Sequence, residues 1–169
     1  IDALAELRKR LLQKERSRPF VALFVGKGYE AEEMRRRCKE RGIAEQTRFL
    51  GRVVQRSVLM GLYARADLFL FPSIYDNAPL VMREAAAFSV PTVVADRSSA
   101  AAVVTDRQNG FVTKDDPQAM AGTLETIIDN PQLLEQAGRG AVSTIYQSWE
   151  EIVDWVAEQY QRILAAHGS

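Results

Sequence analysis

The stretch from Leu68 to Ala85 constrains the fold of this chain more than any other. It opens with an apolar run, Leu68 to Phe71, which predicts a strand buried in a parallel sheet, and Pro72 ends that strand. A polar loop follows, and a helix is predicted to begin near Pro79, because proline is tolerated in the first helical turn. A strand, a loop and a helix in this order are typical of an open α/β sheet, which binds ligands beyond the carboxyl ends of its strands.

Two carboxylates lie in this unit. Asp76 falls in the loop, and Glu84 lies about five residues into the predicted helix, about 7–8 Å along its axis from Pro79. The first N–H groups of the helix suit a diphosphate, while the carboxylates can accept hydrogen bonds from sugar or ribose hydroxyls. This combination indicates a nucleotide-sugar. The alternative is that Asp76 or Asn77 only caps the helix and that Glu84 is a solvated helix residue.

Composition excludes several classes of protein. The 169 residues are 47% hydrophobic and 26% charged, which predicts one globular domain with a full core. The net charge of +0 gives no basic field for nucleic acid or for an anionic membrane. Cys38 is the only cysteine, so we expect no internal disulfide and a reducing compartment. The basic runs at 8–10 and 35–37 have acidic neighbours and predict exposed helix faces.

Strands and helices are predicted to alternate along the whole chain. The apolar runs at 20–25 and 91–95 predict buried strands, and the final helix is amphipathic, with Ile152, Val153, Val156, Tyr160, Ile163 and Leu164 predicted to face inward. We therefore expect a Rossmann-like, doubly wound parallel sheet of about five or six strands with a helical C-terminal end. The strands are expected at 20–25, 47–50, 68–71, 91–95 and 111–113, and the helices at 2–16, 29–41, 55–66, 79–88, 116–129, 131–146 and 150–166.

The order of short motifs resembles the C-terminal, nucleotide-sugar-binding domain of the group 1 (family 4) retaining glycosyltransferases, which have two facing Rossmann-like domains. The resemblance covers nearly the whole chain and implies one half of a glycosyltransferase B-type fold. The motifs that carry it are, in order, Phe24 to Glu30, Arg48 to Gly51, Tyr63 to Ser73, Asp76 to Glu84, Val90 to Ala95 and Asn109 to Val112.

The central motif of that family is two glutamates separated by seven residues, and Asp76 and Glu84 occupy the two positions here. The resemblance implies that Glu84 holds the ribose hydroxyls of the donor and that Asp76, one methylene shorter than the family's Glu, lies near the transferred sugar. It also implies that the backbone of Asn77, Ala78 and Leu80 faces the phosphates and the sugar.

Other family positions are matched in part. The chain departs from the family after its Val-Pro strand, where the family often has Gly-Gly and then Glu and this chain has Ser98, Ser99 and Ala102. A glycine turn beside the donor cleft and a stretch along the nucleobase are matched by residues that the resemblance assigns to donor binding: Gly26, Lys27, Gly28, Arg52 and Val53.

The resemblance also implies what the whole protein does. The chain opens on Ile1 without Met, so we expect residues 1–169 to be the C-terminal donor-binding domain of a longer enzyme, without its first strand and its N-terminal acceptor domain. The parent would move a hexose-type sugar from a UDP- or GDP-linked donor to a glycan or lipid hydroxyl, whereas the fragment alone should be inactive. We expect no cofactor, no metal, no nucleic acid and no transmembrane segment; Asp115 and Asp116 precede Pro117 as a helix cap. The expected location is cytoplasmic, with any contact to the inner membrane face made by the missing part.

Three alternatives stay open. Sugar-nucleotide epimerases and phosphorylases have similar paired domains, and a non-catalytic nucleotide-binding or interaction domain is a further class. Gly26, Gly28 and Ala31 fit a relaxed dinucleotide fingerprint, which would suit an NAD enzyme. Against that enzyme, the strand at 47–50 is followed by Gly51 and Arg52, where an acidic ribose ligand is expected.

Overall fold

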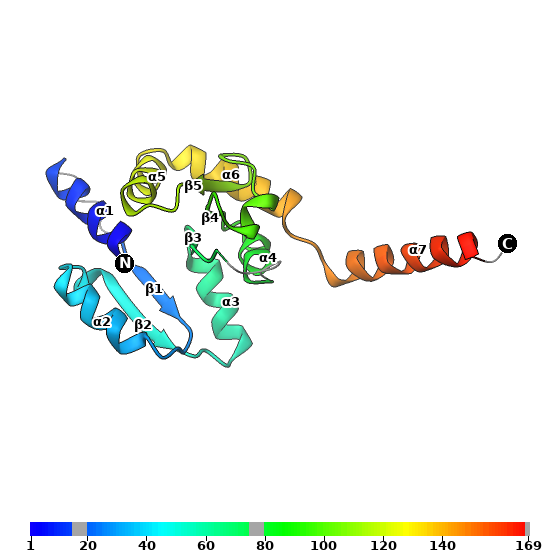
Figure 1. Ribbon diagram of the computed structural model, residues 1–169, viewed down its shortest axis with the longest axis horizontal. Helices are drawn as coiled ribbons and strands as arrows, with labels where there is room; N and C mark the ends of the chain where they lie inside the picture. The colour runs from blue at the N-terminus through cyan, green and yellow to red at the C-terminus, as the bar shows by residue number, and fades with distance from the viewer. Residues whose placement is uncertain (15–19, 75–79, 168–169) are drawn as a thin grey trace.

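A computed structural model describes residues 1–14, 20–74 and 80–167. Within these ranges it has seven α-helices and five β-strands. The helices are α1 (Asp2–Gln13), α2 (Ala31–Glu40), α3 (Arg56–Arg65), α4 (Leu80–Ala87), α5 (Pro117–Asp129), α6 (Pro131–Thr144) and α7 (Trp149–His167), and the strands are β1 (Ala22–Val25), β2 (Thr47–Gly51), β3 (Phe69–Phe71), β4 (Thr92–Ala95) and β5 (Gly110–Thr113). Helices and strands alternate from α1 to β4, and three helices follow β5 (Figure 1).

All recorded strand pairs are parallel, as predicted, and they form two sheets. β1 pairs with β2, and β4 lies between β3 and β5. Within the described ranges β1 and β3 therefore each have a strand on one side only, so the expected single sheet is divided into two. The alternation of helices with parallel strands still confirms the Rossmann-like α/β class.

One core joins the two sheets. Phe24 of β1 stacks on Phe49 of β2 with ring centroids 4.6 Å apart, and both pack against a cluster that includes Val93 and Phe111. Val94 faces the other side of β4 and belongs to a second cluster with residues of α4 and α6. The three-stranded sheet is therefore covered on both faces, as in a doubly wound domain.

β1 differs from the prediction of a fully buried strand. Its burial alternates, with Ala22 and Phe24 directed to the core and Leu23 and Val25 exposed. An apolar run alone does not determine whether both faces of a strand are covered, and here packing against the core covers one face.

The predicted helix ends are confirmed where a side chain or a glycine sets them. The Asp116 carboxylate accepts a hydrogen bond from Ala119 N at 2.8 Å and caps α5, as expected before Pro117. Gly42, just past α2, has a φ of +72°, which an L side chain rarely adopts. A glycine inside α6 allows close packing instead. A Cβ added at Gly140 would lie 1.9 Å from Gln108 O, so this helix packs directly on the loop before β5.

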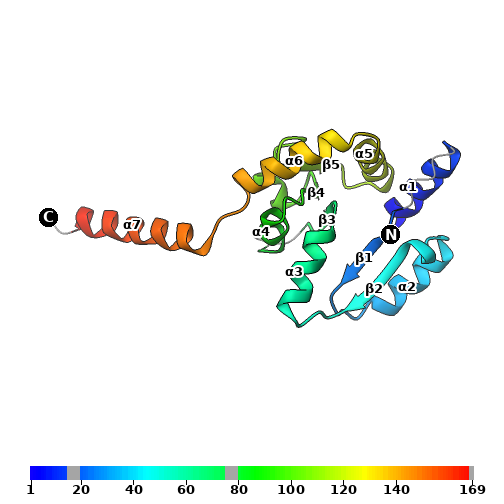
Figure 2. The same cartoon turned by 180° about the vertical axis from the view of Figure 1, so that it is seen from behind.

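The prediction for the last helix is correct in position and wrong in packing. Figures 1 and 2 show α7 extending away from the remainder of the molecule. Its apolar residues are mostly exposed, including Val153, Val156, Tyr160, Ile163 and Leu164, all of which were predicted to face inward. The amphipathic pattern is present, but the described residues bring no second surface against it.

Candidate functional site

The described residues include only part of the central loop. Asp76, Asn77 and Ala78 lie outside the described residues, so their predicted roles stay predictions. Leu80 is the first residue of α4 and is exposed, and Glu84 lies one turn further along the same helix. The helix follows β3 on its carboxyl side, which is the edge where an α/β sheet binds ligands.

Two side chains of α3 hold the Glu84 carboxylate. Tyr63 Oη donates a hydrogen bond to Glu84 Oε2 at 3.3 Å, and Arg56 Nη1 lies 3.5 Å from Oε1. Arg56 and Tyr63 are seven residues apart, about two helical turns, so they lie on one face of α3. The Glu84 side chain keeps 26% of its surface exposed and is accessible to a ligand.

Tyr63 is the rigid member of this group. Only 8% of its surface is exposed, and its ring stacks on Phe88 at 6.3 Å and meets Phe69 edge-on at 6.0 Å. Burial and the neighbouring negative charge of Glu84 raise the pKa of Tyr63 to about 12. The hydroxyl therefore stays protonated and acts as a hydrogen-bond donor at neutral pH.

A second group of predicted residues lies at the carboxyl ends of β1 and β2. Gly26 N donates to Gly51 O at 2.8 Å, and both glycines have positive φ, +140° and +67°. Lys27, Gly28 and Arg52 are exposed beside this turn, and Val53 is half-buried. The structure thus brings together the glycine turn and the stretch after β2, which the sequence assigned to one cleft.

Arg56 connects the two groups along the chain. It begins α3 four residues after Arg52 and reaches Glu84 on α4. The ion pair of Arg56 with Glu84 thus joins the segment that follows β2 to the carboxylate of α4.

The segment after β4 is organised by serine rather than glycine. Ser98 Oγ donates to Ala95 O at 2.7 Å and accepts a hydrogen bond from Ala101 N at 3.2 Å, and it caps a short 3₁₀ helix, Ser99–Val103. The hydroxyl is buried and used within its own turn. Ala102 is exposed and offers no carboxylate.

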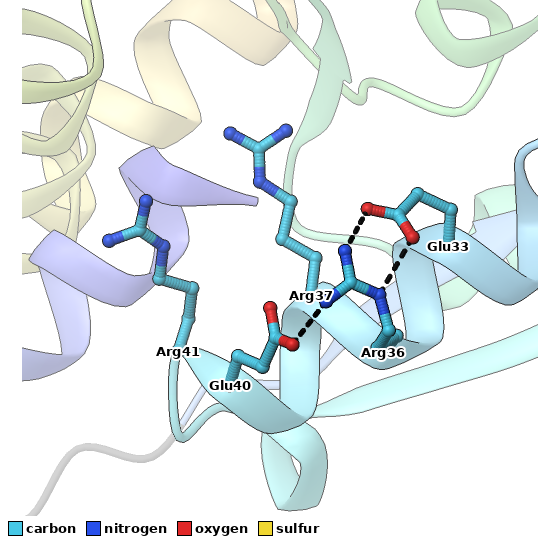
Figure 3. A pocket seen from close by; sticks show the side chains of 5 residues that line it. All are labelled: Glu33, Arg36, Arg37, Glu40 and Arg41. Atoms are coloured by element: carbon cyan, nitrogen blue, oxygen red, sulfur yellow. Dashed lines mark hydrogen bonds and ion pairs between the residues drawn. The ribbon is translucent and has the colours of Figure 1, made fainter.

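Two hollows in the described surface lie away from these residues. One, of about 280 Å³, is lined by residues of α2 and its end: Glu33, Arg36, Arg37, Glu40 and Arg41. Figure 3 shows Arg36 between Glu33 and Glu40, with which it forms ion pairs. The other two arginines, Arg37 and Arg41, pair with Asp2 of α1. The larger hollow, of about 740 Å³, lies over α1 and the start of α5. The ion pairs confirm the prediction of an exposed charged helix face at 35–37.

The described residues contain no group of three or more His, Cys, Asp or Glu side chains able to hold a metal ion. None of their helices is both long enough and apolar enough to cross a lipid bilayer.

Sequence reasoning missed Tyr63 and Arg56 as partners of Glu84. The ring of Tyr63 packs in an apolar cluster with Ala85 and Val90, so its residue type alone fits a core residue. A buried tyrosine hydroxyl usually has a hydrogen-bond partner, and that requirement was the available signal. The identity of the partner depends on how α3 crosses α4, which the spacing of residues within one helix does not encode.

Comparison with known proteins places the chain among glycosyltransferases. The family model of the glycosyl transferases group 1 matches residues 1–143. D-inositol 3-phosphate glycosyltransferase 2 of Catenulispora acidiphila is 30% identical over 169 residues, which cover 96% of this chain and 39% of the relative. The chain spans about two fifths of the length of the curated relatives it matches, between 38% and 41% for three of them.

Solved structures share the fold. Sucrose-phosphate synthase from Thermosynechococcus elongatus superposes with a TM-score of 0.77 at 20% identity, over 98% of this chain and 42% of that one. Anabaena HepE in complex with UDP gives a TM-score of 0.72 at 23% identity, over 95% of this chain and 43% of that one. At these identities the likeness is one of fold.

Proposed function

The chain belongs to the group 1 glycosyltransferases, and from that premise we propose that it is the nucleotide-sugar-binding part of a retaining glycosyltransferase. The parent enzyme moves a hexose-type sugar from a UDP- or GDP-linked donor to a hydroxyl acceptor. The donor is a substrate, and the proposed reaction needs no cofactor.

The observation that carries this proposal is the environment of Glu84. Its carboxylate is partly exposed on the carboxyl side of β3 and contacts two side chains of α3. An ionised carboxylate has about four acceptor positions, so positions remain for a pair of neighbouring hydroxyls after Tyr63 has taken one. The vicinal 2′- and 3′-hydroxyls of a ribose suit such an acceptor. HepE, which shares the fold, was solved in complex with UDP.

The remaining residues have proposed roles around the same ligand. The turn at Gly26, Lys27 and Gly28 borders the donor, and Arg52 and Val53 lie along the nucleobase. The start of α4 at Leu80, with Asn77 and Ala78 before it, faces the diphosphate and the sugar. Asp76 contacts the transferred sugar.

The chemistry follows from where charge develops. As the glycosidic bond breaks, negative charge grows on the leaving diphosphate, and fixed N–H groups and cations stabilise that charge more in the transition state than in the ground state. Lys27 and Arg52 are exposed cations that can contribute. A site closed against water would keep the donor from hydrolysis.

We further propose that residues 1–169 are one donor-binding domain and that the acceptor is bound by another part of a longer enzyme. The share of the relatives' length that the chain spans supports this division. On this proposal the chain binds donor and does not transfer the sugar alone.

The test is a titration of the chain with UDP, GDP, ADP, NAD and the UDP- and GDP-sugars, followed by backbone amide NMR shifts. A uridine or guanosine nucleotide is expected to shift residues 26–28 and 80–84, and Glu84→Ala should remove the response. Glu135→Ala, which deletes an exposed carboxylate paired with Arg139 on α6, is the matched control and should not. Saturable binding of NAD alone would overturn the proposal.

A further inference from the structure

The recorded side-chain contacts that join α3 to α4 include an asymmetric pair at Glu84. One carboxylate oxygen faces the buried Tyr63 hydroxyl at 3.3 Å, and the other faces Arg56 at 3.5 Å. Tyr63 is 8% exposed and locked between two aromatic rings, whereas the Arg56 side chain is 75% exposed. The two contacts therefore differ in rigidity, although both come from one face of one helix.

From this asymmetry we propose that Tyr63 is a positioning residue, which fixes the Glu84 carboxylate in the orientation that receives the vicinal hydroxyls of the donor's ribose. The inference rests on the proposed function, because it assigns a ribose to Glu84. It adds a residue that does not touch the donor and acts through the carboxylate.

The physical argument concerns the cost of ordering a flexible side chain. A free glutamate side chain has three rotatable bonds, and fixing it on a ligand consumes conformational entropy that reduces affinity. A hydrogen bond from an immobile tyrosine fixes the carboxylate before the ligand arrives. Arg56 cannot do the same, because a long exposed side chain retains its own freedom and its pairing is screened by water.

The geometry also defines which oxygen is held by a buried partner. Tyr63 has one hydroxyl hydrogen and directs it to Oε2, whereas Oε1 faces the exposed Arg56, so acceptor positions on both oxygens remain for a ligand. A hydroxyl pair then meets a carboxylate of defined plane. The discrimination between a ribose and a sugar without these hydroxyls therefore depends on Tyr63.

The test compares Tyr63→Phe, which removes the hydroxyl and keeps the ring stacking, with Tyr160→Phe in exposed α7 as the control. Each variant of the 169-residue chain is titrated by NMR with the better-bound nucleotide, UDP or GDP, and with its 2′,3′-dideoxy analogue. Tyr63→Phe is expected to weaken binding of the ribonucleotide about fivefold to tenfold and to leave the dideoxy analogue nearly unchanged. Tyr160→Phe should change neither.

Two further variants separate this proposal from the proposed function. Glu84→Gln should remove the preference for the ribonucleotide, and Tyr63→Phe with Glu84→Gln should bind no worse than Glu84→Gln alone, because the tyrosine acts through the carboxylate. If the unsubstituted chain prefers the ribonucleotide and Tyr63→Phe keeps that preference, the positioning role is wrong and the donor site stands. If the unsubstituted chain binds no nucleotide, or binds the ribonucleotide and its dideoxy analogue equally, both proposals are overturned. Equal losses for the two analogues in Tyr63→Phe would mean a merely structural tyrosine and would also overturn the inference.

Discussion

Strands β1 and β4 have nearly the same sequence character and very different surroundings. Each has four residues, each is apolar along most of its length and each lies in a parallel sheet. Every residue of β4 is buried, with Val93 directed to one core cluster and Val94 to the other, whereas β1 alternates partly buried and exposed residues. Coverage by helices, and not the apolar run itself, therefore determines how much a strand contributes to stability.

The largest effect is expected where helix α6 closes over the doubly covered sheet. A Cβ at Gly140 would lie 1.9 Å from Gln108 O, and the backbone must move to accept it. Gly140→Ala should lower the free energy of unfolding by about 3 kcal/mol, measured by urea denaturation.

The matched control is Gly61→Ala in α3, a helical glycine with no atom within 4 Å of its added Cβ. This substitution should raise stability by about 0.5–1 kcal/mol, because alanine is the better helix former. Equal effects at the two glycines would mean that α6 does not pack on the loop before β5 as closely as described.

The second prediction tests the two strands directly. Val94→Ala should lower the free energy of unfolding by about 2 kcal/mol, because it removes a fully buried side chain and leaves a cavity. Val25→Ala removes the same atoms from a side chain that is 44% exposed and should cost less than about 1 kcal/mol. If both substitutions cost the same in urea denaturation, the exposed face of β1 is covered in solution.

These two strands also mark what sequence reasoning could and could not reach. All five strands and the class of fold followed from apolar runs and turn residues, because those signals are local. The exposure of Leu23 and the extended position of α7 did not follow, because each depends on which other surface packs against it. Glu84 was found from its place in a motif, whereas its partner Tyr63 required the crossing of two helices.

The third prediction concerns that crossing, which joins α3 to the better-covered sheet. A negative carboxylate disfavours ionisation of a neighbouring phenol, so Glu84→Gln should lower the pKa of Tyr63 from about 12 toward its ordinary value of 10.0. Burial is the larger cause and persists, so part of the elevation should remain. An NMR pH titration of ¹³C-labelled tyrosine measures the shift.

The control for the titration is Glu135→Gln on α6, which has no recorded contact with Tyr63 and should leave its pKa unchanged. The raised pKa also makes the stability of the fold depend on pH. Because the pKa of Tyr63 is higher in the folded chain than in the unfolded chain, its contribution to the free energy of unfolding is complete below pH 10 and is lost as the pH rises toward 12. Tyr63→Phe should remove that part of the alkaline loss of stability, and an unchanged pH profile would contradict the assignment.

The smallest effect is expected at the charged face of α2, which lies behind the less-covered pair of strands. Arg36 pairs with Glu33 at 2.5 Å and with Glu40, and all three side chains are more than half exposed. Since solvent screens such pairs, Arg36→Ala should leave the thermal midpoint nearly unchanged at low and at high salt.

Glu125→Gln offers the contrast, because this carboxylate is only 14% exposed and pairs with Arg10 and Lys14 across the contact of α1 with α5. It should lower the midpoint clearly, since it removes the carboxylate that both cations share at a half-buried contact between helices and leaves Arg10 and Lys14 with their ion pairs to Glu6 and Asp129. A larger drop for Arg36→Ala than for Glu125→Gln would mean that the charged network, and not the shared core, holds α2 to the domain.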